Sequence, residues 1–230
     1  DALQHGLHVL VEKPLATDME TARKMVATAD RDRLVLQVGH QERFVSKAIG
    51  LFDIDETPTR IVAKRTCKFQ QRGTDVSVTM DLMIHDLELI TALTGLMPTG
   101  LQSSTRSGPS RGIDETRVHL SYQSGIEAEL FASRMAEETV RSMEIFYPSG
   151  TVHVDFVSKT LIHDTPFALN GNFASDALAA DSLGASDNAF IEAVLRGTAT
   201  PVSGIDGARA LSLALEADLA PELATAHIAV

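Results

Sequence analysis

The chain opens with two apolar runs separated by an amphipathic segment. Residues 8–12 and 33–40 read as short, nearly continuous apolar strands. Between them, residues 16–30 place apolar side chains at helical spacing, and Thr17 followed by Glu20 is typical of a helix-capping box. Two such strands joined by a helix predict parallel strands in a sheet that is covered on both faces.

After the second run, the pattern changes to alternating strands and one strongly apolar helix. Residues 59–69 alternate like a half-exposed strand, and residues 78–96 are apolar on nearly every side, which predicts a buried helix ending near Gly95. Further along, turn residues at 123–125 and 148–150 predict two hairpins. We expect an antiparallel meander with apolar side chains on both faces, one face packed against the chain and the other open to a partner.

The last part of the chain predicts a loop and two helices. Residues 166–186 show little periodicity and predict a long loop, whereas 187–196 and 206–220 predict helices. The expected fold is therefore α/β followed by α+β. Residues 1–44 would form part of a doubly wound, Rossmann-type parallel sheet, and residues 45–230 a larger domain with a mostly antiparallel, open-faced sheet and helices on one side.

Composition narrows the classes of partner. Lys and Arg number 20 against 31 Asp and Glu, so the net charge is −11. This charge argues against nucleic acid or a membrane as the main partner, but it leaves room for a small anion in a local basic site. A single cysteine, Cys67, fits a reducing cytoplasm. No His-Glu-x-x-His or Cys-x-x-Cys spacing occurs, so we expect no metal site.

Polar residues follow both apolar strands at the point where each strand ends. Glu12, Lys13 and Pro14 end the first, and a segment from Gly39 to Arg43 ends the second. Because ligands bind at the carboxyl edge of an open parallel sheet, this edge is a candidate site. A cis peptide before Pro14 would be one way to hold Lys13 in place, while the alternative is an ordinary solvated lysine.

The apolar helix carries a second group of candidate residues. Asp81 and His85 are four apart and share one helix face, so the carboxylate could orient the imidazole as a general base. The alternative is a hydrogen-bonded core histidine beside an aspartate at the helix entry. Asp86 points to a different side of the helix from Asp81 and His85, where it would either bind substrate or form a structural salt bridge.

These segments carry a resemblance to a known family. The stretch "GLHVLVEKPLATDMETARKMV", then "LQVGHQERF" and "DLMIHDLELI", resembles the glucose–fructose oxidoreductase, inositol dehydrogenase and rhizopine-catabolism family of NAD(P)-dependent oxidoreductases. The resemblance runs from end to end of the chain and includes the closing "PVSGIDGARALSLALEA". Within this family, the segments most resemble a branch of UDP-N-acetylglucosamine 3-dehydrogenases.

The resemblance implies roles for the candidate residues. Lys13 would contact the nicotinamide and polarise the reacting hydroxyl, with Glu12, Pro14 and His40 also at the cofactor. His85 would accept the hydroxyl proton, and Asp81 would orient it or share in the transfer. The residues that would bind the substrate are Lys13, Arg43, Asp81, His85 and Asp86. For Arg43 a structural ion pair is the competing interpretation.

One hallmark of the family does not occur in this chain. The Gly-x-Gly-x-x-Gly phosphate-binding turn, which opens such a Rossmann domain, is missing from the 230 residues, as is the residue that selects between NAD and NADP. We therefore expect a chain that lacks the N-terminal part of its Rossmann domain and that, by itself, binds a dinucleotide poorly.

The resemblance implies an oxidoreductase that uses NAD or NADP to oxidise a hydroxyl of a sugar, cyclitol or sugar nucleotide. Two alternatives stay open: a hydrolase or lyase that uses NAD transiently, and a non-catalytic sugar-binding regulatory module. Assembly is expected as a homodimer or homotetramer through the antiparallel sheet.

Overall fold

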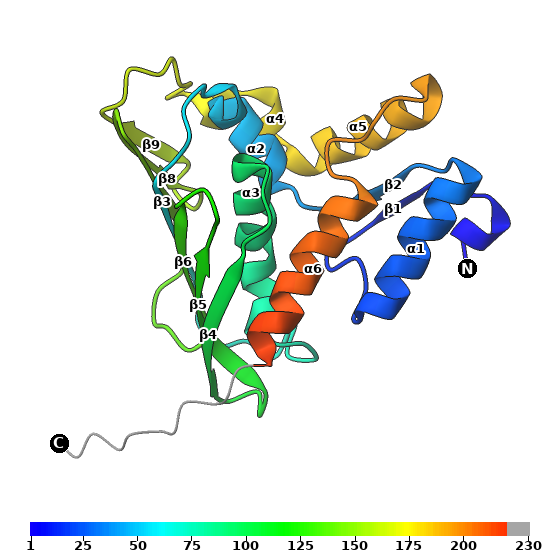
Figure 1. Cartoon of the computed structure of the whole chain (residues 1–230), viewed down its shortest axis with the longest axis horizontal. Helices are drawn as coiled ribbons and strands as arrows, with labels where there is room; N and C mark the ends of the chain where they lie inside the picture. Colours follow the sequence, from blue (N-terminus) through cyan, green and yellow to red (C-terminus); the bar gives the residue numbers. More distant parts are fainter. Residues whose placement is uncertain (220–230) are drawn as a thin grey trace. The chain divides into compact units, whose positions relative to one another are not determined.

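The computed structural model describes residues 1–219, which divide into two units by packing (Figure 1). The first unit comprises residues 1–56, 87–95 and 166–212; the second comprises 57–86, 96–165 and the chain from 213. The predicted boundary between residues 44 and 45 stays a prediction.

The first unit contains the predicted parallel strands. Strand β1 (Val9–Val11) pairs in parallel with β2 (Leu36–Val38), and helix α1 (Met19–Asp32) connects them. The helix begins one residue later than the capping-box prediction, because the side chain of Asp18, not that of Thr17, accepts a hydrogen bond from the Thr21 N–H at 2.8 Å. The strand–helix–strand prediction is confirmed.

Close approach to β2 requires glycine in α6 (Gly204–Asp218). A Cβ atom at Gly207 would lie 2.6 Å from a methyl group of Val38, and one at Gly204 would lie 2.5 Å from Leu36. Gln37 of the same strand donates from its side-chain amide to the carbonyl oxygen of Ser186, at 2.9 Å. Two later helices thus pack on the short parallel sheet.

The predicted loop at residues 166–186 is wrong in its second half. A 3₁₀ turn (Phe173–Ser175), the short helix α4 (Ala177–Ala180) and α5 (Ser182–Arg196) occupy it. Asp176 and Asp181 cap the two helices by accepting backbone N–H bonds, a local signal that the weak periodicity concealed. The end of the predicted last helix at residue 220 lies outside the described residues.

Three further elements complete the first unit: helix α2 (Glu42–Ile49) and the 3₁₀ turns Leu3–His5 and Leu51–Asp53. Gly50 closes α2 in the left-handed conformation, with φ of 92°. No helix of residues 1–219 is both long and apolar enough to cross a membrane.

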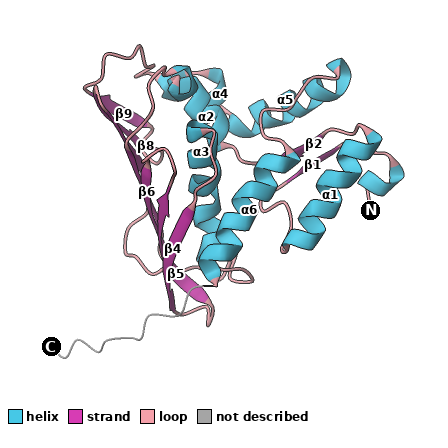
Figure 2. Cartoon of the chain, viewed as in Figure 1, coloured by secondary structure: helices cyan, strands magenta, loops and turns pink. Residues whose placement is uncertain are grey.

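The second unit is built on a seven-stranded sheet (Figure 2). Its strands, in spatial order, are β4 (Gly100–Ser107), β5 (Ile113–Ser121), β6 (Glu127–Ser133), β3 (Arg60–Thr66), β7 (Val140–Tyr147), β8 (Gly150–Asp155) and β9 (Thr160–His163). Both predicted hairpins are present, as β5–β6 and β7–β8. The simple meander is wrong in one respect: β3 inserts between β6 and β7 and runs parallel to β6.

The two faces of this sheet differ in chemistry. Ile61, Ala63 and the alternating residues of neighbouring strands are buried on the inner face. The expectation of apolar side chains on both faces is confirmed in part: Phe131 and Phe146 lie on the outer face, which is otherwise mainly charged and polar. The ion pairs and cation–π contacts of this face include Arg60–Glu129 at 2.8 Å, His119–Glu127 at 2.9 Å, Arg60 over the Phe146 ring, and Arg117 over the Phe131 ring at 4.1 Å.

Helical residues of the second unit cover the inner face. A π-helical turn (Thr79–Met83) contacts β3, β5 and β6, and the Thr79 and Thr116 hydroxyls share a hydrogen bond of 2.8 Å. Near the end of α6, the Ala217 carbonyl accepts from Ser103 Oγ at 2.9 Å. The expected mostly antiparallel sheet with helices on one side is confirmed.

Candidate active site

The structure brings the polar ends of β1 and β2 together, as predicted. The backbone N–H of Gly39 donates to the carbonyl oxygen of Val11 at 2.8 Å, which extends the pairing beyond both strands. The Glu12 carboxylate lies against the same glycine, since a Cβ atom at Gly39 would be 3.0 Å from its Oε2. A side chain at position 39 would require the Glu12 carboxylate to move by a few tenths of an ångström.

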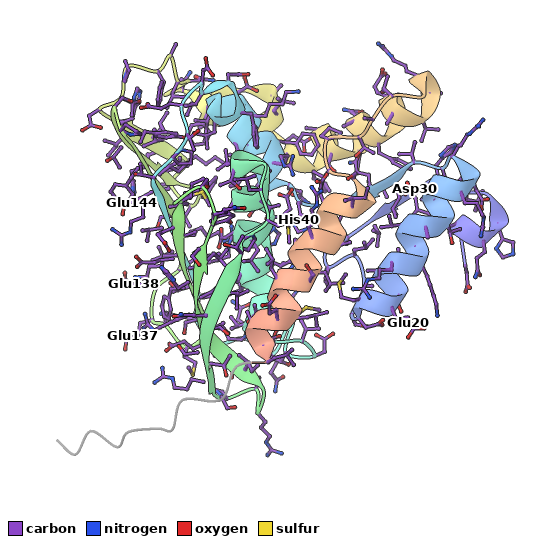
Figure 3. All side chains as sticks on the ribbon, in the orientation of Figure 1. Glu20, Asp30, His40, Glu137, Glu138 and Glu144 are labelled. Carbon is purple, nitrogen blue, oxygen red and sulfur yellow. The ribbon has the colours of Figure 1, made fainter. Side chains whose placement is uncertain are left out.

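The predicted cofactor residues differ in exposure. Glu12 is exposed, Lys13 and Pro14 are half-buried, and His40 is buried at 1% exposure (Figure 3). The Lys13–Pro14 peptide bond is cis. The edge therefore offers Glu12 and Lys13 directly to a ligand, whereas His40 lies beneath the surface, and its contact with a cofactor stays a prediction.

Asp81 and His85 lie on the apolar helix on either side of the point where a π-helical turn passes into a regular α-helix. Asp81 belongs to the π-helical turn, and His85 to the first turn of α3 (Ile84–Thr94), which ends at Gly95 as predicted. Both side chains are partly exposed, whereas Met83 and Ile84 between them are fully buried. Single π turns in helices are frequent at functional sites, and this one carries the predicted orienting carboxylate.

A loop from β3 to the π turn lies against Asp81. A Cβ atom at Gly73 would be 2.8 Å from Asp81 Oδ2, which leaves little space for a side chain. Gly73 also has a φ of 72°, a backbone conformation that favours glycine. The buried Arg134 holds this loop by donating to the carbonyl oxygens of Gly73 and Val76, at 2.8 and 3.0 Å. Sequence reasoning missed Arg134, because an arginine at a strand end gives no local signal.

Asp86 forms a salt bridge rather than facing a ligand. Arg65 of β3 donates from Nε and from one terminal nitrogen to the two carboxylate oxygens of Asp86, at 3.0 and 2.8 Å. Both side chains are almost fully buried, at 3% and 4% exposure. Of the two predicted roles for Asp86, the structure therefore favours the structural one, and it anchors the first turn of α3 next to His85.

Arg43 also forms an ion pair. Its guanidinium contacts the Glu88 carboxylate and donates to the Pro201 carbonyl oxygen at 3.3 Å. Glu88 is 1% exposed, and burial raises its pKa to about 7, since the Arg43 charge offsets only part of the desolvation. The competing interpretation of Arg43 as a structural pair thus has direct support, and its contact with substrate stays a prediction.

A dinucleotide fits this chain in part. The exposed Glu12 and half-buried Lys13 suit the nicotinamide end, because a ribose hydroxyl bonds to a carboxylate and a lysine donates to a reacting oxygen. The glycine-rich turn that would hold the pyrophosphate does not occur in the sequence.

Comparison with known proteins agrees with this geometry. Residues 1–40 match the model of an oxidoreductase family with an NAD-binding Rossmann fold, and residues 52–153 match the GFO/IDH/MocA C-terminal domain. A UDP-N-acetylglucosamine 3-dehydrogenase of Acidithiobacillus ferrooxidans is 33% identical over 96% of this chain and 73% of its own length. The chain belongs to the GFO/IDH/MocA oxidoreductase family.

Other relatives agree with this membership. The rhizopine catabolism protein MocA of Rhizobium meliloti is 27% identical over 46% of the chain and 36% of its own length. A solved structure of the Acidithiobacillus enzyme superposes with a TM-score of 0.84 at 32% identity, over 94% of this chain and 70% of that one. The WlbA dehydrogenase of Bordetella pertussis, solved with NADH and UDP-GlcNAcA, shares the fold at 20% identity, with a TM-score of 0.77 over 94% of this chain and 70% of that one.

As a GFO/IDH/MocA oxidoreductase, the chain is a dehydrogenase that depends on NAD or NADP. The two family models match residues 1–40 and 52–153, and the predicted division into domains 1–44 and 45–230 stays a prediction.

The buried pair Arg65–Asp86 predicts a non-additive effect on stability. Arg65→Met or Asp86→Leu alone should lower the free energy of unfolding by about 3–5 kcal/mol, because each leaves one buried charge without its partner. The double variant should recover most of this loss, since no unpaired charge remains. Urea unfolding of the four proteins measures the coupling, and additive losses would contradict it.

Glu88 predicts a pH dependence of stability. Its pKa is about 7 in the folded chain against a usual value of 4.5, so between these values the folded state binds a proton that the unfolded state has lost. Stability should therefore fall as pH rises through this window, and the penalty is complete above about pH 7.

In Glu88→Gln the change in unfolding free energy between about pH 5 and about pH 8 should shrink by on the order of 1–3 kcal/mol. The exposed Glu216→Gln serves as the control and should leave the profile as it is. An unaltered profile in the Glu88 variant would show that this carboxyl does not titrate in the window.

Proposed function

We propose that this chain oxidises a hydroxyl of a sugar nucleotide, of the UDP-N-acetylglucosamine kind, by hydride transfer to NAD or NADP. The observation that carries the proposal is the similarity to the Acidithiobacillus 3-dehydrogenase along nearly the whole chain. Retention of Lys13 at a ligand-binding edge, and of Asp81 and His85 at a partly exposed π turn, supports catalysis rather than sugar binding alone.

The proposed mechanism assigns one role to each residue. Lys13 donates a hydrogen bond from Nζ to the reacting hydroxyl oxygen and stabilises the negative charge that develops there. His85 accepts the hydroxyl proton at a ring nitrogen, and Asp81 orients the imidazole. A bound NAD would supply the hydride acceptor. Glu12 would bind the nicotinamide ribose.

Substitution of the proposed base tests this assignment. In the full-length gene product, His85→Ala should lower kcat by roughly 10²–10⁴-fold, the usual contribution of a general base. Asp81→Asn should lower kcat with the fold intact, and Lys13→Ala should lower kcat far more than it weakens NAD binding. The measurement is accumulation of NADH with UDP-N-acetylglucosamine, followed by absorbance.

The exposed His5→Ala is the matched control and should keep full activity. Stoichiometric NADH separates oxidation from an NAD-assisted elimination or hydrolysis, in which no net NADH appears. Near-normal turnover in both His85→Ala and Asp81→Asn would make the pair structural.

We further propose self-association through the outer face of the seven-stranded sheet, as at least a dimer, in the cytoplasm. The single cysteine supports the compartment. An open depression of about 680 Å³ on this face is lined by side chains of both signs, among them Arg117 and Glu129, with Phe131. Intermixed charges of both signs suit a two-fold interface, in which the same patch meets itself.

Light scattering at micromolar concentration tests the interface. The unaltered protein should have at least twice the chain mass, and Phe131→Asp should shift it to the monomer, because a carboxylate would be buried without a partner. Leu195→Asp is the control, since Leu195 is 75% exposed on α5, which belongs to the first unit. A monomeric native protein would rule out this assembly.

A further inference from the structure

The loop from the end of β3 to the π turn concentrates positive charge. Residues 64–73 carry four cationic side chains, Lys64, Arg65, Lys68 and Arg72, and no carboxylate, although the whole chain has a net charge of −11. Arg65 is occupied by the buried pair with Asp86, and Lys64 alternates with it onto the outer face. Lys68 and Arg72 remain exposed in the loop.

The loop is fixed in place beside Asp81. Arg134 holds the carbonyl oxygens of Gly73 and Val76, and Ser77 Oγ accepts from the Met80 N–H at 3.0 Å, so the end of the loop is tied to the π turn. Gly73, the residue after Arg72, approaches the Asp81 carboxylate without room for a side chain. Arg72 is therefore one residue along the chain from a direct approach to Asp81.

The beginning of the loop lies in the same surroundings. Burial raises the pKa of the Cys67 thiol, and three charges act on it: Arg134 and Arg141 lower the pKa, whereas Asp81 raises it. Cys67 directly precedes Lys68, so the Asp81 charge acts at the start of the loop as well as at Gly73. Arg141 pairs in register with Arg65 and adds a further exposed cation at this end of the sheet.

Acidic residues lie near the start of the segment, since Thr66 Oγ1 donates to the Glu138 carbonyl oxygen at 2.9 Å. Glu137 and Glu138, in the loop between β6 and β7, point to the same side of the sheet as Glu144 of the outer face (Figure 3). No ion pair recorded within residues 1–219 involves Lys68 or Arg72. Asp75 is the one exposed carboxylate further along the same loop.

We propose that Lys68 and Arg72 bind the diphosphate of a sugar nucleotide whose sugar reacts at Asp81 and His85. This inference rests on the proposed function and names the part of the substrate that the loop recognises. In a sugar nucleotide the diphosphate is attached to the same ring that carries the reacting hydroxyl, so a basic group near the proposed base is within reach of the diphosphate. Arginine and lysine are the side chains that bind phosphate oxygens best.

Titration with UDP tests the site without requiring oxidation. The native protein should bind UDP and inorganic pyrophosphate, and Lys68→Gln or Arg72→Gln should each weaken binding by roughly tenfold or more, as expected for loss of one hydrogen bond between charged groups. The double variant should bind more weakly still and show a shallower dependence on salt. Both positions are exposed, so the variants should melt at the native temperature.

Lys47→Gln is the matched control, because it removes one exposed positive charge from α2 in the first unit. Its affinity for UDP should match the native value. A native protein that fails to bind UDP, or a double variant that binds UDP as tightly as the native protein, would overturn the assignment.

Turnover separates this inference from the proposed function. The two loop variants should raise KM for UDP-N-acetylglucosamine at least tenfold with kcat within about twofold, since neither side chain moves the proton. If the native protein binds UDP through Lys68 and Arg72 but oxidises no sugar nucleotide, the proposed function fails and the diphosphate site stands. If oxidation occurs and KM is unchanged in the variants, the site fails and the function stands.

Discussion

A carboxylate inside a protein is stable only when a positive group and hydrogen bonds replace its water, and helix α3 carries two buried carboxylates. Asp86 receives two hydrogen bonds from Arg65, and Glu88 contacts Arg43. Most other buried residues of the helix are apolar, and hydrophobic contacts by themselves would tolerate a small rotation or shift. The two guanidinium groups remove that freedom, because any shift of α3 would leave a buried charge without its partner.

The proposed base depends on this constraint. His85 directly precedes Asp86, so the salt bridge that anchors Asp86 also sets the place of the imidazole along the helix. On its other side the π turn displaces Asp81 from a regular helical position, and the loop at Gly73 closes against the carboxylate. The proposed catalytic residues Asp81 and His85 are thus held in place by neighbouring groups to which we assign no role in the reaction. This agrees with the general need for supporting residues that hold a catalytic constellation in place.

The edge of the parallel sheet also places polar side chains within a short stretch of structure. Strands β1 and β2 are three residues each and are followed by Glu12, Lys13 and Gly39, and the Glu12 carboxylate lies directly against Gly39. Oxidation of an alcohol needs a hydrogen-bond donor at the oxygen, a base for the proton and a hydride acceptor. The family supplies the last as NAD, and the chain carries side chains suited to the first two.

Local periodicity in the sequence determined the elements: the parallel strand–helix–strand, the apolar helix closed at Gly95 and both hairpins follow from spacing and turn residues. The candidate residues Lys13, Asp81 and His85 were equally visible, because their types and spacing express chemistry directly. Tertiary structure decided what depends on distant partners. The insertion of β3 parallel to β6, the pairing of Arg65 with Asp86 and the hold of Arg134 on Gly73 join residues 21 to about 70 positions apart. No local pattern encodes such pairs, since their stability arises only when folding removes water from both partners at once.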